Sequence, residues 1–265
     1  MSQAANKRTG YVIHVMTASG AVAGMFALNA VIDGHWRVCL IWLIICQVLD
    51  GLDGPIARKF DVEIHAPRID GHILDLVVDY ITCVLVPVAL LIRLHLLPQH
   101  YETLTAAGIF LTSALWFART DLETEDHWFN GFPAVWNLVV PTFLILGATP
   151  KGVLITSLLL GASQLTNFKI PHLVRVKALR VITLPLTIAY LANLTYLSWR
   201  YSDIHGINLE NWQGALLLGF PVYILVLAIW RTWFSEVRIP LLGGITRMES
   251  PARIRRKEFT VKNIE

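Results

Sequence analysis

Eight long apolar segments constrain this chain more than any other feature of its sequence. A helix needs about 20 mostly apolar residues to cross the hydrocarbon core of a bilayer. None of the eight alternates with a period of two, so strands and a membrane barrel are not expected. We predict an all-α polytopic membrane protein with about eight spans. The predicted spans are Tyr11–Ile32, Trp36–Arg58, Gly71–Leu97, Thr103–Arg119, Phe132–Ala148, Gly152–Phe168, Val181–Tyr201 and Trp212–Phe234.

The composition supports a membrane location. Of the 265 residues 55% are hydrophobic and 15% are charged, against about 25% charged residues in an ordinary soluble domain. The mean hydropathy is +0.55. A water-soluble domain of this size could not bury so much apolar surface. A soluble globular enzyme and a disordered chain are therefore both excluded.

The positive charges predict how the chain lies in the membrane. With eight spans both termini share one side, and that side holds 18 of the 22 Lys and Arg residues. The other side holds Arg37, Arg93, Lys151 and Arg200. Since Lys and Arg are enriched in cytoplasmic loops, both termini are predicted to be cytoplasmic. We expect a single transmembrane catalytic domain over residues 1–245 and a polar, basic cytoplasmic tail over residues 246–265.

Four aspartates lie where charge is costly. Asp50 and Asp53 end the second predicted span, and Asp75 and Asp79 lie in the first turns of the third. An ionised carboxylate inside a span costs about 2.5–3.5 kcal/mol and normally has a partner. Each pair has the spacing of one helix face, and the two helices are antiparallel neighbours, so the acids can meet. Two divalent cations are the simplest neutraliser, and oxygen ligands suit Mg²⁺ or Mn²⁺.

Small residues and one arginine accompany these acids. Gly51, Gly54 and Ala57 leave room for a ligand or a neighbouring helix to approach α-helical backbone closely. Arg58 supplies a fixed cation that suits a phosphate oxygen. Carboxylates, divalent cations, arginine and glycine together predict a diphosphate site. The structural alternative is that the acids pair with basic residues at the membrane edge, namely Arg58, Lys59 and Arg68.

The same residues resemble the signature of the CDP-alcohol phosphotransferases, integral membrane enzymes of phospholipid synthesis. The matching positions are Asp50, Asp53, Gly54, Ala57, Arg58, Gly71, Asp75 and Asp79. The spacer from Lys59 to Asp70 is longer than is usual in the family. That spacer and the eight expected spans resemble the bacterial phosphatidylcholine synthase branch, as does the stretch from Phe129 to Asn137.

The resemblance implies a reaction and a set of roles. Asp50, Asp53, Asp75 and Asp79 would ligate two divalent cations, Mn²⁺ or Mg²⁺, and Asp79 would also act as the general base. The nucleotide pocket would be formed by Gly54, Ala57, Arg58 and Gly71. The enzyme would transfer the phosphatidyl group from CDP-diacylglycerol to choline and release CMP. It would work in the bacterial inner membrane, with the active site on the cytoplasmic side, among membrane lipids and as a possible homodimer; nucleic acid is not an expected partner.

Choline is a quaternary ammonium, which proteins hold with aromatic faces and a carboxylate. The segment after the fourth predicted span is rich in both. We predict that choline binds there, and the candidate residues are Asp121, Glu123, Trp128, Phe129, Phe132 and Trp136. The alternative is an aromatic belt at the membrane interface beside a solvated acidic loop. Asn137 and Asn193, inside later spans, are predicted to form hydrogen bonds between helices.

Two other functions remain open from the sequence. The acceptor could be serine, inositol or glycerol phosphate in the same chemistry, although an anionic acceptor would need basic residues where this chain has aromatic and acidic ones. A cation transporter could use the four aspartates as its ion site. Transporter sites usually lie at the midplane between internal repeats, whereas these acids lie near one edge of the membrane and no repeat is visible.

Overall fold

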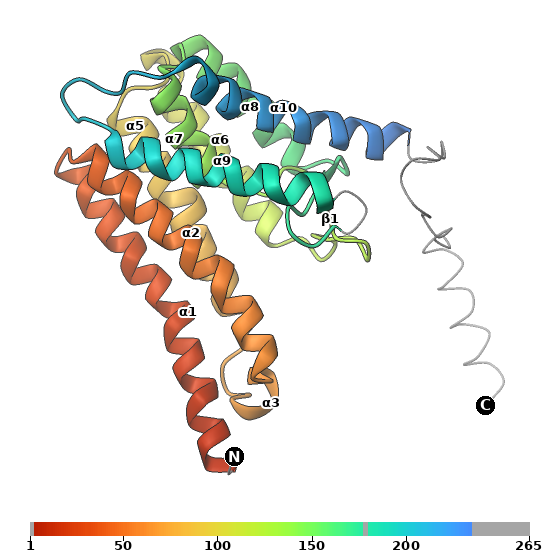
Figure 1. Cartoon of the computed structure of the whole chain (residues 1–265). Coiled ribbons are helices and arrows are strands. Elements are labelled where there is room, and N and C mark those ends of the chain that lie inside the picture. Colours follow the sequence, from red (N-terminus) through yellow and green to blue (C-terminus); the bar gives the residue numbers. More distant parts are fainter. Residues whose placement is uncertain (1–2, 177–179, 235–265) are drawn as a thin grey trace.

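The computed structural model describes residues 3–176 and 180–234, and this part of the chain is almost entirely helical (Figure 1). The helical elements are α1 (Gln3–Ile32), α2 (Trp36–Lys59), α3 (Val62–His65), α4 (Gly71–Asp79), the π-helical η1 (Tyr80–Leu85), α5 (Val86–Arg93), the 3₁₀ turn η2 (Gln99–Tyr101), α6 (Glu102–Phe117), α7 (Trp136–Leu146), α8 (Pro150–Gln164), α9 (Arg180–Arg200) and α10 (Asn211–Trp233). Two strands, β1 (Trp128–Asn130) and β2 (Lys169–Pro171), form an antiparallel ribbon. The all-α prediction missed this ribbon because three-residue strands leave no periodic signal.

Five helical segments are long and apolar enough to cross a membrane. They are Lys7–Ile32, Trp36–Lys59, Gly71–Arg93, Arg180–Arg200 and Asn211–Trp233. The fourth to sixth predicted spans correspond to α6, α7 and α8, which have 16, 11 and 15 residues. At 1.5 Å per residue an 11-residue helix rises about 16 Å, roughly half of the hydrocarbon core. The structure thus supports five of the eight predicted spans.

The fifth predicted span begins later than its apolar sequence suggested. The prediction started the helix at Phe132, whereas α7 begins at Trp136. Pro133 disfavours helical backbone at the residue before it. Ala134 then has a φ of 53°, in the left-handed region that an L-residue other than glycine rarely adopts. The chain therefore turns sharply just before α7, and the helix starts after that turn.

The N-terminal half is organised around a helical hairpin. Figure 1 shows α1 and α2 side by side, with the segment from α4 to α5 packed against α1. Gly20 and Gly24 permit this close packing. A Cβ added at Gly20 would lie 2.7 Å from Val78 Cγ1, and one added at Gly24 would lie 3.0 Å from Ile81 Cγ2. Close contacts between small residues are typical of helices that associate in membranes.

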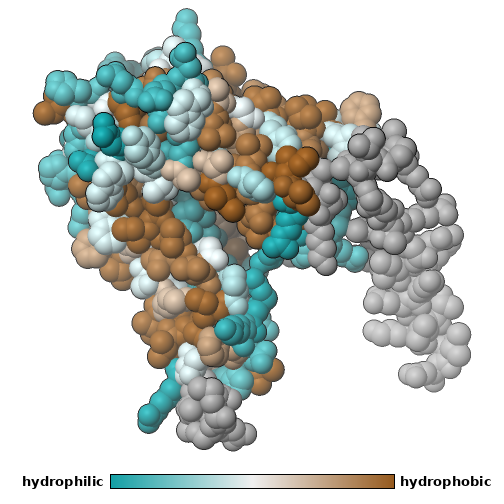
Figure 2. Space-filling view, in the orientation of Figure 1, coloured by the Kyte–Doolittle hydropathy of each residue, from teal (hydrophilic) through white to brown (hydrophobic). Residues whose placement is uncertain are grey.

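The interior and the exterior are both apolar. The core includes the fully buried Leu40, Leu91, Trp136, Leu194 and Leu217, contributed by five different helices. Large apolar side chains also cover the outer helix faces, and the share of residues buried is only 22% in α10. Figure 2 shows hydrophobic residues exposed along the α1–α2 hairpin. Hydrophilic residues gather at the upper left of this view, at the end of the hairpin where α1 leads into α2. Such a surface is suited to contact with lipid.

Two of the four basic residues predicted to lie away from the termini, Arg37 and Arg93, lie near the start of α2. The guanidinium of Arg37 lies over the ring of Trp199, and that of Arg93 over the ring of Trp36. Arg58 and Lys59 lie in the last turn at the opposite end of α2. The two pairs thus lie at opposite ends of α2, and the sides of the membrane that they face stay a prediction. Lys177 and the predicted tail over residues 246–265 lie outside the described residues.

Candidate active site

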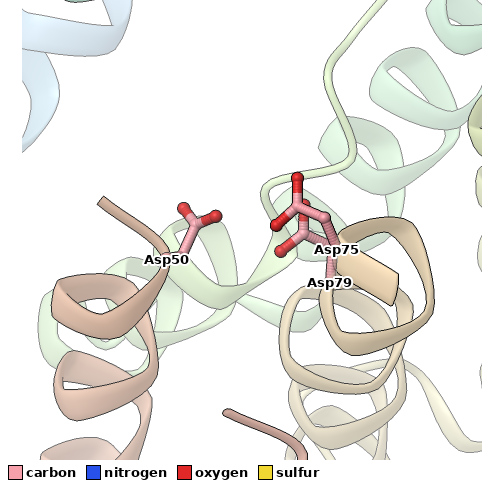
Figure 3. A group of neighbouring side chains, drawn as sticks. All are labelled: Asp50, Asp75 and Asp79. Carbon is pink, nitrogen blue, oxygen red and sulfur yellow. The ribbon is translucent and has the colours of Figure 1, made fainter. Parts of the chain in front are cut away.

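Three carboxylates from two helices meet between α2 and α4. Asp50 lies in α2, and Asp75 and Asp79 lie one turn apart in α4. One carboxylate oxygen from each residue lies within 4.8 Å of one from each of the other two. Figure 3 shows the Asp50 side chain directed across the gap toward Asp75 and Asp79. The predicted convergence of acids from neighbouring helices is therefore found for these three residues.

Asp53, the fourth predicted ligand, lies beside this cluster and outside the group of three. Its exposed fraction is 8%. Its carboxylate is within hydrogen-bonding reach of the Thr17 side chain of α1, and it is close enough to Asp50, Asp75 and Asp79 to repel each of them. Asp53 thus adds negative charge to the site, while its assignment as a ligand stays a prediction.

Local features of the chain hold the two acidic faces in place. Asp70 caps the start of α4 by accepting hydrogen bonds from the backbone N–H groups of His72 and Ile73, at 3.0 and 3.1 Å. The π-helical turn η1 follows directly after Asp79 and ends just before Pro87, which cannot donate a backbone hydrogen bond to the preceding turn. Such widened turns often occur at functional sites. Pro55 lies inside α2 between Asp53 and Arg58 and likewise cannot donate a backbone hydrogen bond to the preceding turn.

The predicted nucleotide residues lie in the same two helices as the acids or at their ends, and their assignment stays a prediction. The guanidinium of Arg58 covers Gly54, since a Cβ at Gly54 would lie 3.2 Å from Arg58 Nη1. A Cβ at Gly71 would lie 3.3 Å from Cε1 of His14, a histidine whose exposed fraction is 5%. Ala57 packs against a small apolar cluster formed by Ile13, Val62 and Ala66. These glycines therefore let the side chains of Arg58 and His14 approach the helix backbone closely.

The aromatic residues predicted to hold choline are largely engaged by the fold. Trp136 is fully buried and its Nε1 donates to Ser113 Oγ at 3.0 Å, while Phe132 packs against it. Trp128 has an exposed fraction of 4%, and the guanidinium of Arg231 lies 5.7 Å from its ring centroid. Phe129 stacks on His172, with ring centroids 5.3 Å apart. The guanidinium of Arg231 thus already lies over the Trp128 ring, where a choline cation would bind.

The two predicted acidic choline residues also have partners. Arg119 makes a two-pronged hydrogen bond to Asp121, at 2.8 and 2.9 Å, and this contact lowers the pKa of Asp121 below its usual range. Glu123 accepts from His127 at 2.7 Å and from Arg175 at 3.3 Å. Arg175 also interacts electrostatically with Asp75. The charge of Arg175, which is paired with Glu123, thus also acts on the carboxylate cluster.

The segment that carries Arg175 also contains two partly buried basic side chains, His172 and Lys169. Burial, aided by the nearby charge of Arg175, lowers the pKa of His172 to about 4, so its ring is neutral near pH 7. His172 Nδ1 accepts from the backbone N–H groups of Val174 and Arg175. Burial, followed by the charge of Arg231, lowers the pKa of Lys169, whose Nζ donates to Asn130. These contacts fix the position of the loop after β2.

The donor set of the cluster fits a divalent cation. Ionised carboxylates this close repel one another strongly in a partly buried site. A divalent cation placed among these oxygens would neutralise that repulsion. Hard oxygen donors match Mg²⁺ or Mn²⁺, whereas zinc sites usually include nitrogen or sulfur.

Several contacts near the site were not predicted from the sequence. The predicted hydrogen bonds of Asn137 and Asn193 between helices are confirmed, but Asn137 donates to Gln47, which in turn donates to Asp50. The sequence contained a signal for Gln47, because it lies one helical turn before Asp50. The approach of Arg175 to Asp75 had no local signal, since 100 residues separate them along the chain.

The fold and the acids together define a membrane protein with a carboxylate centre between two helices. Comparison with known proteins identifies the class more closely. The model of the CDP-alcohol phosphatidyltransferase family matches residues 12–168. The chain belongs to this family. Phosphatidylcholine synthase of Pseudomonas aeruginosa is 34% identical over 233 residues, which is 87% of this chain and 96% of that protein.

Further relatives carry the same name. Phosphatidylcholine synthase of Borreliella burgdorferi is 33% identical over 86% of this chain and 96% of its own length. The corresponding protein of Bradyrhizobium diazoefficiens is 35% identical over 69% of this chain and 68% of its own. Family membership favours the predicted transferase over the cation transporter, and it matches the family resemblance of the aspartate signature.

Proposed function

We propose that this chain is a phosphatidylcholine synthase, which transfers the phosphatidyl group of CDP-diacylglycerol to choline and releases CMP. The observation that carries the proposal is the convergence of Asp50, Asp75 and Asp79 within 4.8 Å, inside the region that the family model matches. The similarity to proteins named phosphatidylcholine synthase supports choline as the acceptor.

The chain's own residues account for the steps. Asp79 accepts the proton of the choline hydroxyl, and the resulting oxygen attacks the phosphorus that carries diacylglycerol. The bond from that phosphorus to the CMP oxygen breaks, and CMP leaves with the electron pair. Arg58 binds a phosphate oxygen of the nucleotide. Asp50, Asp53, Asp75 and Asp79 would hold two divalent cations, which when bound would neutralise the diphosphate and stabilise charge on the leaving group.

The choline site is proposed to border the segment from Asp121 to Trp136. The ion pair between Glu123 and Arg175 supports this location, because the charge of Arg175 also acts on Asp75 of the reacting centre. Alanine at Trp128 or Phe129 should raise the apparent choline KM. Alanine at Trp136 should instead lower stability, because this ring is fully buried. Unchanged choline KM values in both the Trp128 and Phe129 variants would place the site elsewhere.

The membrane arrangement is also a proposal. We propose a bacterial inner-membrane protein with eight spans, cytoplasmic termini and the active site on the cytoplasmic side. The charge sorting supports it, because Arg37 and Arg93 lie at the end of the molecule away from Arg58 and Lys59. Cysteines introduced near Lys59 and near His205 should react with an impermeant reagent from opposite sides. The division into a domain over residues 1–245 and a tail, and a homodimeric state, rest on the sequence and the resemblance.

The acceptor can be determined with purified protein. The assay supplies CDP-diacylglycerol, Mn²⁺ or Mg²⁺, and labelled choline, with serine, inositol and glycerol phosphate in parallel reactions. We expect labelled phosphatidylcholine and CMP with choline alone. CMP release with serine alone would identify serine as the acceptor in place of choline. No CMP release with any acceptor would refute the transferase function.

A further inference from the structure

Two amide side chains link the start of α7 to the carboxylate cluster. Gln47 lies in α2 and its Nε2 donates to Asp50 Oδ2 at 3.3 Å. Asn137 lies in the first turn of α7 and its Nδ2 donates to Gln47 Oε1 at 2.9 Å. The exposed fraction of Asn137 is 4%. A continuous series of hydrogen bonds therefore runs from Asn137 of α7, through Gln47 of α2, to the carboxylate of Asp50.

The polarity of this series is set at its acidic end. An ionised carboxylate only accepts hydrogen bonds, so the amino group of Gln47 must face Asp50. The carbonyl oxygen of Gln47 then faces Asn137, which must turn its own amino group toward it. Reversing either amide would place two acceptors against each other. Both side chains are thus held in the one orientation that suits a negatively charged Asp50.

Asn137, which ends this series of hydrogen bonds on the side away from Asp50, is costly to bury. Asn137 Oδ1 is buried without a hydrogen-bond partner among the described residues, although buried polar atoms in proteins nearly always have one. Just before α7 the backbone also takes the left-handed conformation at Ala134. An apolar residue at position 137 would avoid the unpaired oxygen. The amide is therefore better explained by what it does for Gln47 than by stability.

We infer that Gln47 and Asn137 are positioning residues, which orient Asp50 for the divalent cations of the proposed reaction. The inference rests on the proposed function, because Asp50 is a predicted ligand there. Asn137 acts only through Gln47, and Gln47 acts directly on Asp50. Partners that orient a ligand typically change metal affinity or activity by about 10–100-fold when they are removed.

The test uses the purified full-length chain and Mn²⁺ alone, with free Mn²⁺ measured by electron paramagnetic resonance. Gln47→Met and Asn137→Leu keep the approximate size of each side chain and remove its amide. We expect each substitution to weaken Mn²⁺ binding about 10–100-fold. The double variant should bind like Gln47→Met alone, because Asn137 has no other route to Asp50. At saturating Mn²⁺ the choline KM should stay at the wild-type value.

A matched control separates positioning from packing. Asn193 is also a buried asparagine between helices: its Nδ2 donates to the Gln213 carbonyl at 3.2 Å, and its Oδ1 likewise has no hydrogen-bond partner among the described residues. Asn193→Leu should leave Mn²⁺ binding unchanged. Should Asn137→Leu fail to fold, Gln47→Met carries the test, because Gln47 is only half-buried.

Three results would overturn the inference: wild-type Mn²⁺ affinity in both single variants, a double variant whose loss is the product of the single losses, or an equal loss in Asn193→Leu. Failure of the proposed function has a different signature. In that case the unaltered chain itself would bind no Mn²⁺ or would release no CMP.

Discussion

Removing one charge from the aspartate cluster should raise stability and abolish the response to metal. Carboxylate oxygens of Asp50, Asp75 and Asp79 lie within 4.8 Å of one another. At that separation two full charges repel by about 3.5 kcal/mol with an effective dielectric constant of about 20. The three side chains are only partly buried, so solvent screens part of this repulsion. For Asp79→Asn we therefore expect the metal-free free energy of unfolding to rise by about 1–3 kcal/mol.

Asp79→Asn should also reduce the stabilisation that the folded chain gains from Mn²⁺. A cation that binds only the folded chain stabilises it by about 2.7 kcal/mol at 100 times its dissociation constant. Thermal unfolding in detergent, with a chelator and then with Mn²⁺, measures both effects. We expect the unaltered chain to unfold at a lower temperature than Asp79→Asn in chelator, and to gain more from Mn²⁺. A less stable metal-free variant that still gains fully from Mn²⁺ would refute the reasoning.

Three further predictions concern the elements around the site. Asp70→Ala removes the cap of α4 and should cost about 1 kcal/mol of stability, whereas Asp70→Asn should cost less; equal losses by chemical denaturation would exclude capping. Gly20→Ala places a Cβ 2.7 Å from Val78 Cγ1, so it should cost about 1–3 kcal/mol of stability and reduce turnover. Adding Val78→Ala to this variant should restore both stability and turnover. If it restores neither, the clash lies elsewhere. Because the folded pKa of His172 is about 4, below its unfolded value, protonation favours unfolding. Stability should therefore fall as the pH drops below about 6.5, by about 1–2 kcal/mol after allowing for partial exposure, and His172→Gln should lose that part of the pH dependence in melting curves.

The acidic centre could be predicted from the sequence because its causes are local. Asp50 and Asp53, and Asp75 and Asp79, have helical spacing, and a short connection makes their helices neighbours. The cost of charge in a membrane then requires that they meet. Asp53 shows the limit of this argument. Spacing placed it on the face of Asp50, but it lies outside the group of three, close to Thr17 of α1.

The remaining features depend on contacts between distant segments. Three predicted spans are helices of 16 residues or fewer. For α7, Pro133 and the left-handed backbone at Ala134 delay the start of the helix inside an apolar run. Hydropathy does not record such breaks. The predicted choline aromatics likewise have partners far along the chain, such as Arg231 for Trp128 and His172 for Phe129. Aromatic and acidic composition alone could not distinguish an open cage from occupied ring faces.

The central claim is that α2 and α4 together hold divalent cations at their aspartates. Anomalous X-ray scattering from manganese, in crystals of protein that turns over CDP-diacylglycerol, tests it most directly. The account predicts manganese peaks in contact with Asp50, Asp75 and Asp79, and their loss in Asp79→Asn. Manganese bound elsewhere, or active protein with no manganese between these helices, would contradict it.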